Sequence, residues 1–151
     1  MFGKPKPRNE VEKVWTEARV LSRLLDRLTL SDLTSKEAVD YLQRKGCPED
    51  LAARAIAYCQ ERGFLDDQRF ASGLVEKAQR TGWSLRKLRQ VEAQKGLPAS
   101  QDLDEGQACL ELAQRWLLRG VVPEKVGARL QRRGFNYSLV KSTLNQLQEE
   151  L

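Results

Sequence analysis

The side chains that could carry out chemistry in this chain of 151 residues are few and poorly matched to one another. Asp66 and Asp67 are a carboxylate pair, but adjacent residues at a helix start diverge, and no partner is evident nearby. Histidine is absent, which removes the usual general base near neutral pH. Cys47, Cys59 and Cys109 lack the spacing of a zinc site or a disulfide framework, and we expect them to pack as small apolar residues. We therefore predict no enzyme activity, no metal and no cofactor.

Basic side chains are the more promising functional groups. The chain carries 26 Lys and Arg against 21 Asp and Glu, a net charge of +5. Segments 84–95 and 123–133 each have a net charge of +3, and together they exceed the charge of the whole chain. If both segments lie on the same side of the protein, they form a basic face that could bind acidic protein loops or nucleic-acid phosphates. The alternative is that cations in last helical turns only complement the helix dipole. The predicted partner-binding residues are Arg86, Lys87, Arg89, Lys95, Lys125, Arg129, Arg132 and Arg133.

Aromatic residues do not extend this basic pattern along the sequence. Trp15, Trp83 and Trp116 lie in apolar helical contexts, and we predict that they anchor the core rather than stack on bases. The tyrosines, Tyr41 among them, show no alternation with basic residues of the kind found in single-strand binders.

Apolar residues recur at steps of three and four, which predicts helices. A stripe of this kind runs from residue 11 to residue 28, and Thr34 with Glu37 forms a capping-box signature before the next one. Runs of β-branched residues and Asn-Gly or Asp-Gly turns are absent. We therefore predict an all-α chain.

Three segments of the chain resemble one another. The residues around Gly46, Gly96 and Gly134 overlay at offsets of 50 and 38, and apolar positions before and after the glycines match as well. This predicts three tandem three-helix repeats in an elongated, curved array, although helix-Gly-helix echoes occur in any helical protein. The predicted boundaries are a mobile basic arm at 1–9 and repeats at 10–65, 66–106 and 107–151.

The middle repeat departs from its siblings in two ways. It is a dozen residues short, and segment 101–106 lacks the apolar stripe of a third helix. We expect either a shortened third helix there, or Ser100 capping one long helix that reaches Trp116. In addition, Glu92 stands where the other repeats have Leu42 and Leu130. We expect either a slight rotation of that helix or a position for Glu92 at a rim.

Residues 63–71 read Gly-Phe-Leu-Asp-Asp-Gln-Arg-Phe-Ala, and the aspartates can cap the helix that follows. This spelling resembles the opening of the middle unit in the RecX family of recombinase regulators. Segment 82–90 resembles the next helix of that family, and Lys95-Gly96-Leu97 resembles its stop. Segment 132–135 with Leu139 and Val140 resembles the start of the last helix. The resemblance covers residues 16–151 and is strongest over 61–97.

The resemblance implies a regulator that binds RecA filaments on DNA and inhibits RecA in recombination and DNA repair. The partner is then the RecA filament, with a weaker direct contact to DNA, and neither a membrane nor a small-molecule substrate is involved. We expect a cytoplasmic monomer. The alternatives are an autonomous helix-turn-helix DNA-binding protein and a helical adaptor for another protein.

Overall fold

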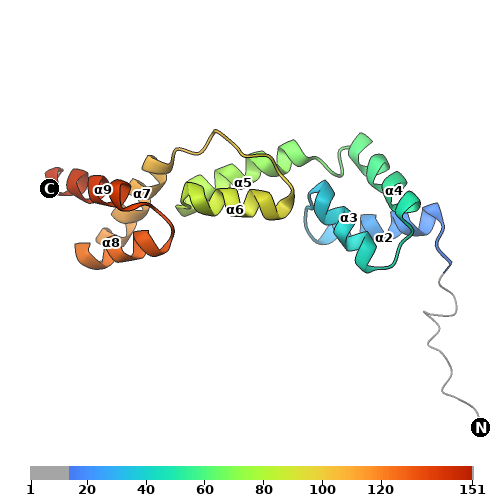
Figure 1. Cartoon of the computed structure of the whole chain (residues 1–151), viewed down its shortest axis with the longest axis horizontal. Coiled ribbons are helices and arrows are strands. Elements are labelled where there is room, and N and C mark those ends of the chain that lie inside the picture. The colour runs from blue at the N-terminus through green and yellow to red at the C-terminus, as the bar shows by residue number, and fades with distance from the viewer. Residues whose placement is uncertain (1–13, 151) are drawn as a thin grey trace, which may run out of the picture. The chain divides into compact units, whose positions relative to one another are not determined.

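A computed structural model describes residues 14–150 and confirms that this part of the chain is all-α (Figure 1). It contains eight helices and no strand within those residues. The arm predicted at 1–9 lies outside them. The helices are α2 (Glu17–Leu30), α3 (Ser35–Arg44), α4 (Glu49–Glu61), α5 (Asp67–Thr81), α6 (Leu85–Lys95), α7 (Glu105–Leu118), α8 (Pro123–Arg132) and α9 (Tyr137–Glu149). The chain divides into two compact units, one ending at Asp66 and the other beginning at Asp67.

The first unit is a three-helix module in which α4 packs against both α2 and α3. Its core contains Val20 and Leu24 of α2, Leu42 of α3 and Ile56 of α4. The capping box predicted at Thr34 is present, with the hydroxyl accepting from the Glu37 amide and the carboxylate accepting from the Thr34 amide. Local sequence signals therefore define the start of α3 correctly.

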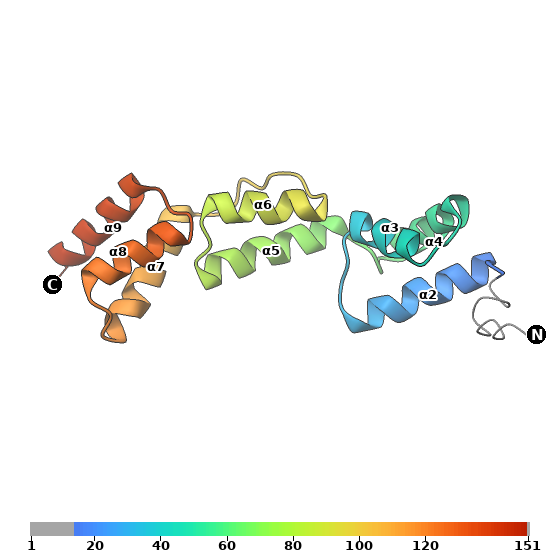
Figure 2. The same ribbon diagram turned by 60° about the horizontal axis from the view of Figure 1, so that its bottom comes forward.

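The second unit holds two apolar clusters. One lies between α5 and α6, which run side by side (Figure 2), and includes Leu74, Trp83 and Leu88. The other lies among α7, α8 and α9 and includes Leu112 and Leu130. Since α7 also packs on α5, the two clusters belong to one body.

Helices α3, α6 and α8 end in the same way. Each is followed by a glycine with a positive φ and then by a buried apolar residue, whose amide returns to a carbonyl near the end of the helix. This is the Schellman arrangement, in which the left-handed residue lets the chain close the last turn. The residues are Gly46 and Cys47, Gly96 and Leu97, and Gly134 and Phe135.

The segment between α6 and α7 differs from both expectations. Residues 97–104 form no helix, so the shortened third helix is absent from this segment. The alternative of one long helix capped by Ser100 is wrong, because α7 begins at Glu105 and Asp104 caps it by accepting from the Gln107 amide. Pro98 and the polar run that follows offer no apolar stripe to stabilise a helix by packing.

Gly134 should be far less replaceable than Gly120, although both have a positive φ in the second unit. A Cβ at Gly134 would lie 2.7 Å from Ser84 Oγ, whereas a Cβ at Gly120 would meet nothing within 4 Å. We expect Gly120→Ala to lower the free energy of unfolding by about 1 kcal/mol through backbone strain alone, and Gly134→Ala to lower it by about 2–4 kcal/mol. Urea titration of both variants measures the difference, and equal losses would contradict the tight junction at Gly134.

Candidate functional site

The N-terminus of α6 meets the C-terminus of α8 in the second unit. Ser84 Oγ accepts from the Lys87 amide at 3.1 Å, which caps α6, and donates to the carbonyl of Arg133 at 3.0 Å. The same hydroxyl thus satisfies an orphan amide of one helix and an orphan carbonyl of the other. The partial positive end of α6 also faces the partial negative end of α8, which is a favourable arrangement of dipoles.

An open groove of about 640 Å³ lies over this junction. It collects four of the eight predicted partner-binding residues, two from each of the predicted basic segments, together with polar amides. The cations are Arg86, Lys87, Arg132 and Arg133, and the amides are Gln90, Gln94 and Gln131. All four cationic residues are exposed. We call this set of lining residues the basic groove.

Aromatic rings contact three of the predicted partner-binding residues. Lys87 Nζ lies 4.5 Å from the centre of the Trp83 ring. The guanidinium carbons of Arg129 and Arg133 lie 5.6 and 5.5 Å from the centre of the Trp116 ring. Cation–π contacts of this kind restrict where a long side chain can point. Trp83 and Trp116 pack in apolar clusters, as predicted, and also orient the charges above them.

Arg133 has a second role within the unit. Its guanidinium donates to the carbonyl of Gly82 at 3.2 Å, at the corner between α5 and α6. The side chain therefore lines the basic groove and also ties the end of α8 to that corner. The remaining charge of the groove is carried by Arg86, Lys87 and Arg132, whose guanidinium and ammonium groups have no such backbone contact among the described hydrogen bonds.

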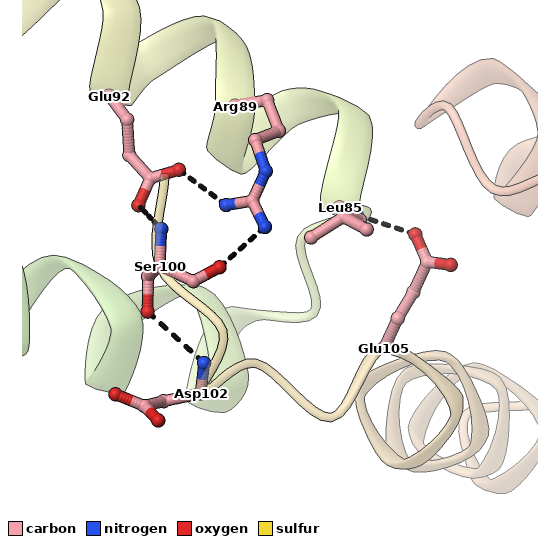
Figure 3. Close-up of polar contacts among 6 residues, drawn as sticks. All are labelled: Leu85, Arg89, Glu92, Ser100, Asp102 and Glu105. Carbon is pink, nitrogen blue, oxygen red and sulfur yellow. Dashed lines mark hydrogen bonds and ion pairs between the residues drawn. The ribbon is translucent and has the colours of Figure 1, made fainter. Parts of the chain in front are cut away.

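The other four predicted residues do not line the basic groove. Arg129 lies on Trp116, and Lys95 lies near the far end of α6 with its Nζ 5.1 Å from the Phe70 ring centre. Lys125 is exposed in the first turn of α8. Arg89 is engaged inside the unit, as Figure 3 shows, in a contact that the sequence did not reveal.

Arg89 and Glu92 bind the non-helical segment 97–104 between α6 and α7, which we call the linker (Figure 3). One guanidinium nitrogen of Arg89 donates to Glu92 Oε1 at 2.7 Å, and the other donates to the carbonyl of Ser100. Glu92 Oε2 accepts from the amide of Ser100 at 2.9 Å. Two side chains of α6 therefore satisfy both backbone groups of one linker residue.

Glu92 itself is only 2% exposed, so both of the alternatives expected for it are wrong. The helix is not rotated, since Leu88 and Glu92 are buried at the positions equivalent to Ala38 and Leu42. A buried carboxylate is tolerated when it is paired and hydrogen-bonded, and here each of its oxygens has a partner. The sequence offered no signal for this because Ser100 lies on an irregular segment.

Two further contacts hold the end of the linker. The side-chain amide of Gln79 on α5 donates to the carbonyl of Asp104 and accepts from its amide, both at 2.9 Å. Glu105 Oε2 then accepts from the amide of Leu85 at 2.5 Å, at the start of α6 (Figure 3). The linker is thereby attached to α5 and α6, and the first residue of α7 is attached to the start of α6.

Metal-binding groups and reactive thiols were the other candidate sites. The described residues contain no group of acidic, cysteine or histidine side chains arranged to hold a metal ion. Burial raises the pKa of the Cys59 thiol and is also the main cause of the raised pKa of the Cys109 thiol. Neither thiol is therefore activated as a nucleophile. Within residues 14–150, the helices are too short or too polar to cross a membrane.

No family model matches the chain, but individual proteins are similar to it in sequence. The regulatory protein RecX of Pectobacterium atrosepticum is 34% identical over 83 residues, which cover 55% of this chain and 50% of that protein. The regulatory protein RecX of Shigella dysenteriae is 33% identical over 90 residues, covering 53% and 54%. The chain thus spans about half the length of the curated relatives that it matches.

Solved structures extend the likeness to most of the fold. A crystal structure of RecX from Lactobacillus salivarius matches with a TM-score of 0.68 and 17% identity, over 87% of this chain and 96% of that chain. A crystal structure of a regulatory protein RecX matches with a TM-score of 0.67 and 22% identity, over 96% and 82%. The helical fold is therefore shared well beyond the region of sequence similarity.

Replacing Glu92 by Leu should loosen the linker, even though leucine occupies the equivalent positions 42 and 130. The change removes the acceptor for the Ser100 amide and the partner of Arg89. We expect a loss of about 1–3 kcal/mol in the free energy of unfolding and faster hydrogen exchange at the Ser100 amide. Mass spectrometry or NMR of the exchanging amides measures the second effect.

The double variant Arg89→Leu/Glu92→Leu is the control for this prediction. It removes both charges together, so no charged partner is left unpaired, and we expect it to be more stable than Glu92→Leu alone. Unchanged exchange at Ser100 in either variant would contradict the role of the network.

Proposed function

Since the chain is similar to the regulatory proteins RecX in sequence and in fold, we propose that it regulates the RecA recombinase in recombination and DNA repair. It does so by binding RecA filaments on DNA and lowering RecA activity, without chemistry of its own. The observation that carries the proposal is the basic groove, where α6 and α8 present cations on one surface of a single compact unit.

The groove fits a partner with closely spaced negative charges. Arg86 and Lys87 lie in the first turn of α6, and Arg132 lies in the last turn of α8, so their positions depend on the junction at Ser84. Two groove cations are already oriented, Lys87 by the Trp83 ring and Arg133 by the Trp116 ring, so they lose less conformational entropy on binding carboxylate or phosphate. Acidic loops of the recombinase or phosphates of its DNA would both provide such charges.

The proposal includes the three-repeat organisation. Supporting it, Ala38, Leu88 and Val126 are fully buried at equivalent positions of α3, α6 and α8. Likewise, Ala52 of α4 corresponds to Val140 of α9, and both are buried. We further propose that the repeats form a curved array and that the protein acts as a cytoplasmic monomer.

Charge reversal in the basic groove should weaken the effect on RecA. We expect the unmodified chain to lower DNA-dependent ATP hydrolysis by RecA at near-stoichiometric amounts. Arg86→Glu/Arg132→Glu should raise the concentration needed for half-inhibition by about tenfold or more, because two attractive contacts become repulsive. Arg89 is left unchanged since its guanidinium holds Glu92.

Lys36→Glu/Arg44→Glu is a matched control. These residues occupy the equivalent first-turn and last-turn positions of α3, and both are exposed, so the charge change and the dipole effect are the same. We expect this variant to inhibit RecA normally. Equal inhibition by both variants would contradict the groove as the binding surface. Strong preference for one duplex sequence, with no effect on RecA, would support the helix-turn-helix alternative instead.

A further inference from the structure

A second basic surface lies on the first unit, along α2 and onto α3. Arg19, Arg23 and Arg27 follow one another at intervals of four, so each is turned by about 40° from the last and the three form a row on α2. Lys45, at the end of α3, adds a fourth cation beside Tyr41. None of these four belongs to the basic groove or to the predicted partner-binding residues.

Aromatic rings alternate with these cations. The guanidinium carbons of Arg19 and Arg23 lie 5.0 and 6.0 Å from the centre of the Trp15 ring. Arg27 and Lys45 approach the Tyr41 ring from different helices, at 6.0 and 5.7 Å. We call these four cations and two rings the aromatic strip. The predicted lack of alternation between tyrosines and basic residues holds along the sequence only. In the folded unit, Arg27 of α2 lies beside the Tyr41 ring of α3.

Every member of the aromatic strip is at least partly exposed, and the acids of α2 leave the arginines of the row in excess. Trp15 and Tyr41 are each half-buried, so their rings pack on the core and keep an open edge or face. Leu30, which is 80% exposed, lies on the same side of α2 as Arg23 and Arg27 by the helical repeat. Asp26 is the acid of α2 on that side, against three arginines.

We infer that the aromatic strip binds single-stranded nucleic acid, with its cations on the phosphates and its rings and guanidinium planes against unpaired bases. Alternating aromatic and cationic side chains are the usual equipment of such sites, since every base has a face on which to stack. From Arg19 to Arg27 the row extends about 12 Å along α2, which matches about three nucleotides at a stacked spacing of about 3.4 Å. A duplex would use only the cations because its bases are already stacked.

An acidic protein segment is the competing occupant, and the observations favour it less. Carboxylates would pair with the arginines and the lysine, but they would gain nothing from Leu30 or from the open parts of the two rings. A single strand offers charged and planar apolar groups in regular alternation, and so uses every member of the strip.

Fluorescence anisotropy with a labelled oligothymidylate and the full chain, without RecA, tests this inference at several salt concentrations. We expect binding that weakens steeply with salt. Arg23→Gln/Lys45→Gln should weaken it about tenfold and make the slope of log affinity against log salt shallower by about 1.4, as for two lost phosphate contacts. Trp15→Leu should weaken binding about tenfold with the slope unchanged, because only stacking is lost. A purely structural role for these residues would not separate the two effects.

Two controls make the result decisive. Lys36→Gln/Arg44→Gln changes two other cations of α3 and should bind the oligonucleotide normally. Circular dichroism confirms that each variant is folded.

Several outcomes would overturn the inference: no binding of the oligonucleotide, equal affinity for a duplex of the same length, or displacement by polyglutamate as effective as by unlabelled oligothymidylate. Because RecA is absent, the inference stands or falls independently of the proposed function. Strand binding without any effect on RecA ATP hydrolysis would overturn the proposed function alone.

Discussion

The pairing of Glu92 with Arg89 and Ser100 is the interaction on which the second unit depends. It places a carboxylate in a core position and satisfies both of its oxygens, one with a guanidinium and one with a backbone amide. The guanidinium then takes the carbonyl of Ser100 as well. Through this residue, the linker is held against α6, and its end reaches Gln79 of α5. The start of α7 is thereby positioned relative to the helix pair that precedes it, without the third helix that would otherwise connect them.

The geometry of the basic groove follows from that connection. Helix α8 packs on α7, and the C-terminus of α8 contacts Ser84. This contact leaves no room for a side chain at position 134, which is a glycine. Arg133 then reaches back to Gly82 and Trp116. The cations of α6 and α8 converge because two helix ends of opposite polarity meet. Like charges in the groove repel one another. The cations at the end of α8 are stabilised by the negative end of that helix dipole, which offsets part of this repulsion. Arg86 and Lys87, at the positive end of α6, gain from binding an anion.

Much of this architecture follows from local sequence patterns. The capping box at Thr34, the glycines that end three helices and the apolar periodicity each depend on residues within a few positions of one another, so a single sequence reveals them. The charge of the two basic segments was also visible in the sequence, and two cations from each of them line the basic groove. By contrast, the partners of Glu92 lie on an irregular segment whose path no periodicity encodes. The rings of the aromatic strip likewise receive their cations partly from another helix, which only the packing of α2 against α3 determines.

The polar, non-helical linker and the buried Glu92 match each other chemically. Leu42 of α3 and Leu130 of α8 are both fully buried, and each lies in a cluster that includes apolar residues of a following helix, Ile56 of α4 and Val140 of α9 respectively. After α6 the corresponding segment is polar and non-helical, so a leucine at position 92 would face backbone amides and carbonyls that lack partners. A glutamate at that position supplies acceptors, and Arg89, one turn away, supplies donors. The polar pair therefore does for an irregular segment what leucine does for a helix, namely to match the chemistry of the surface that packs against it.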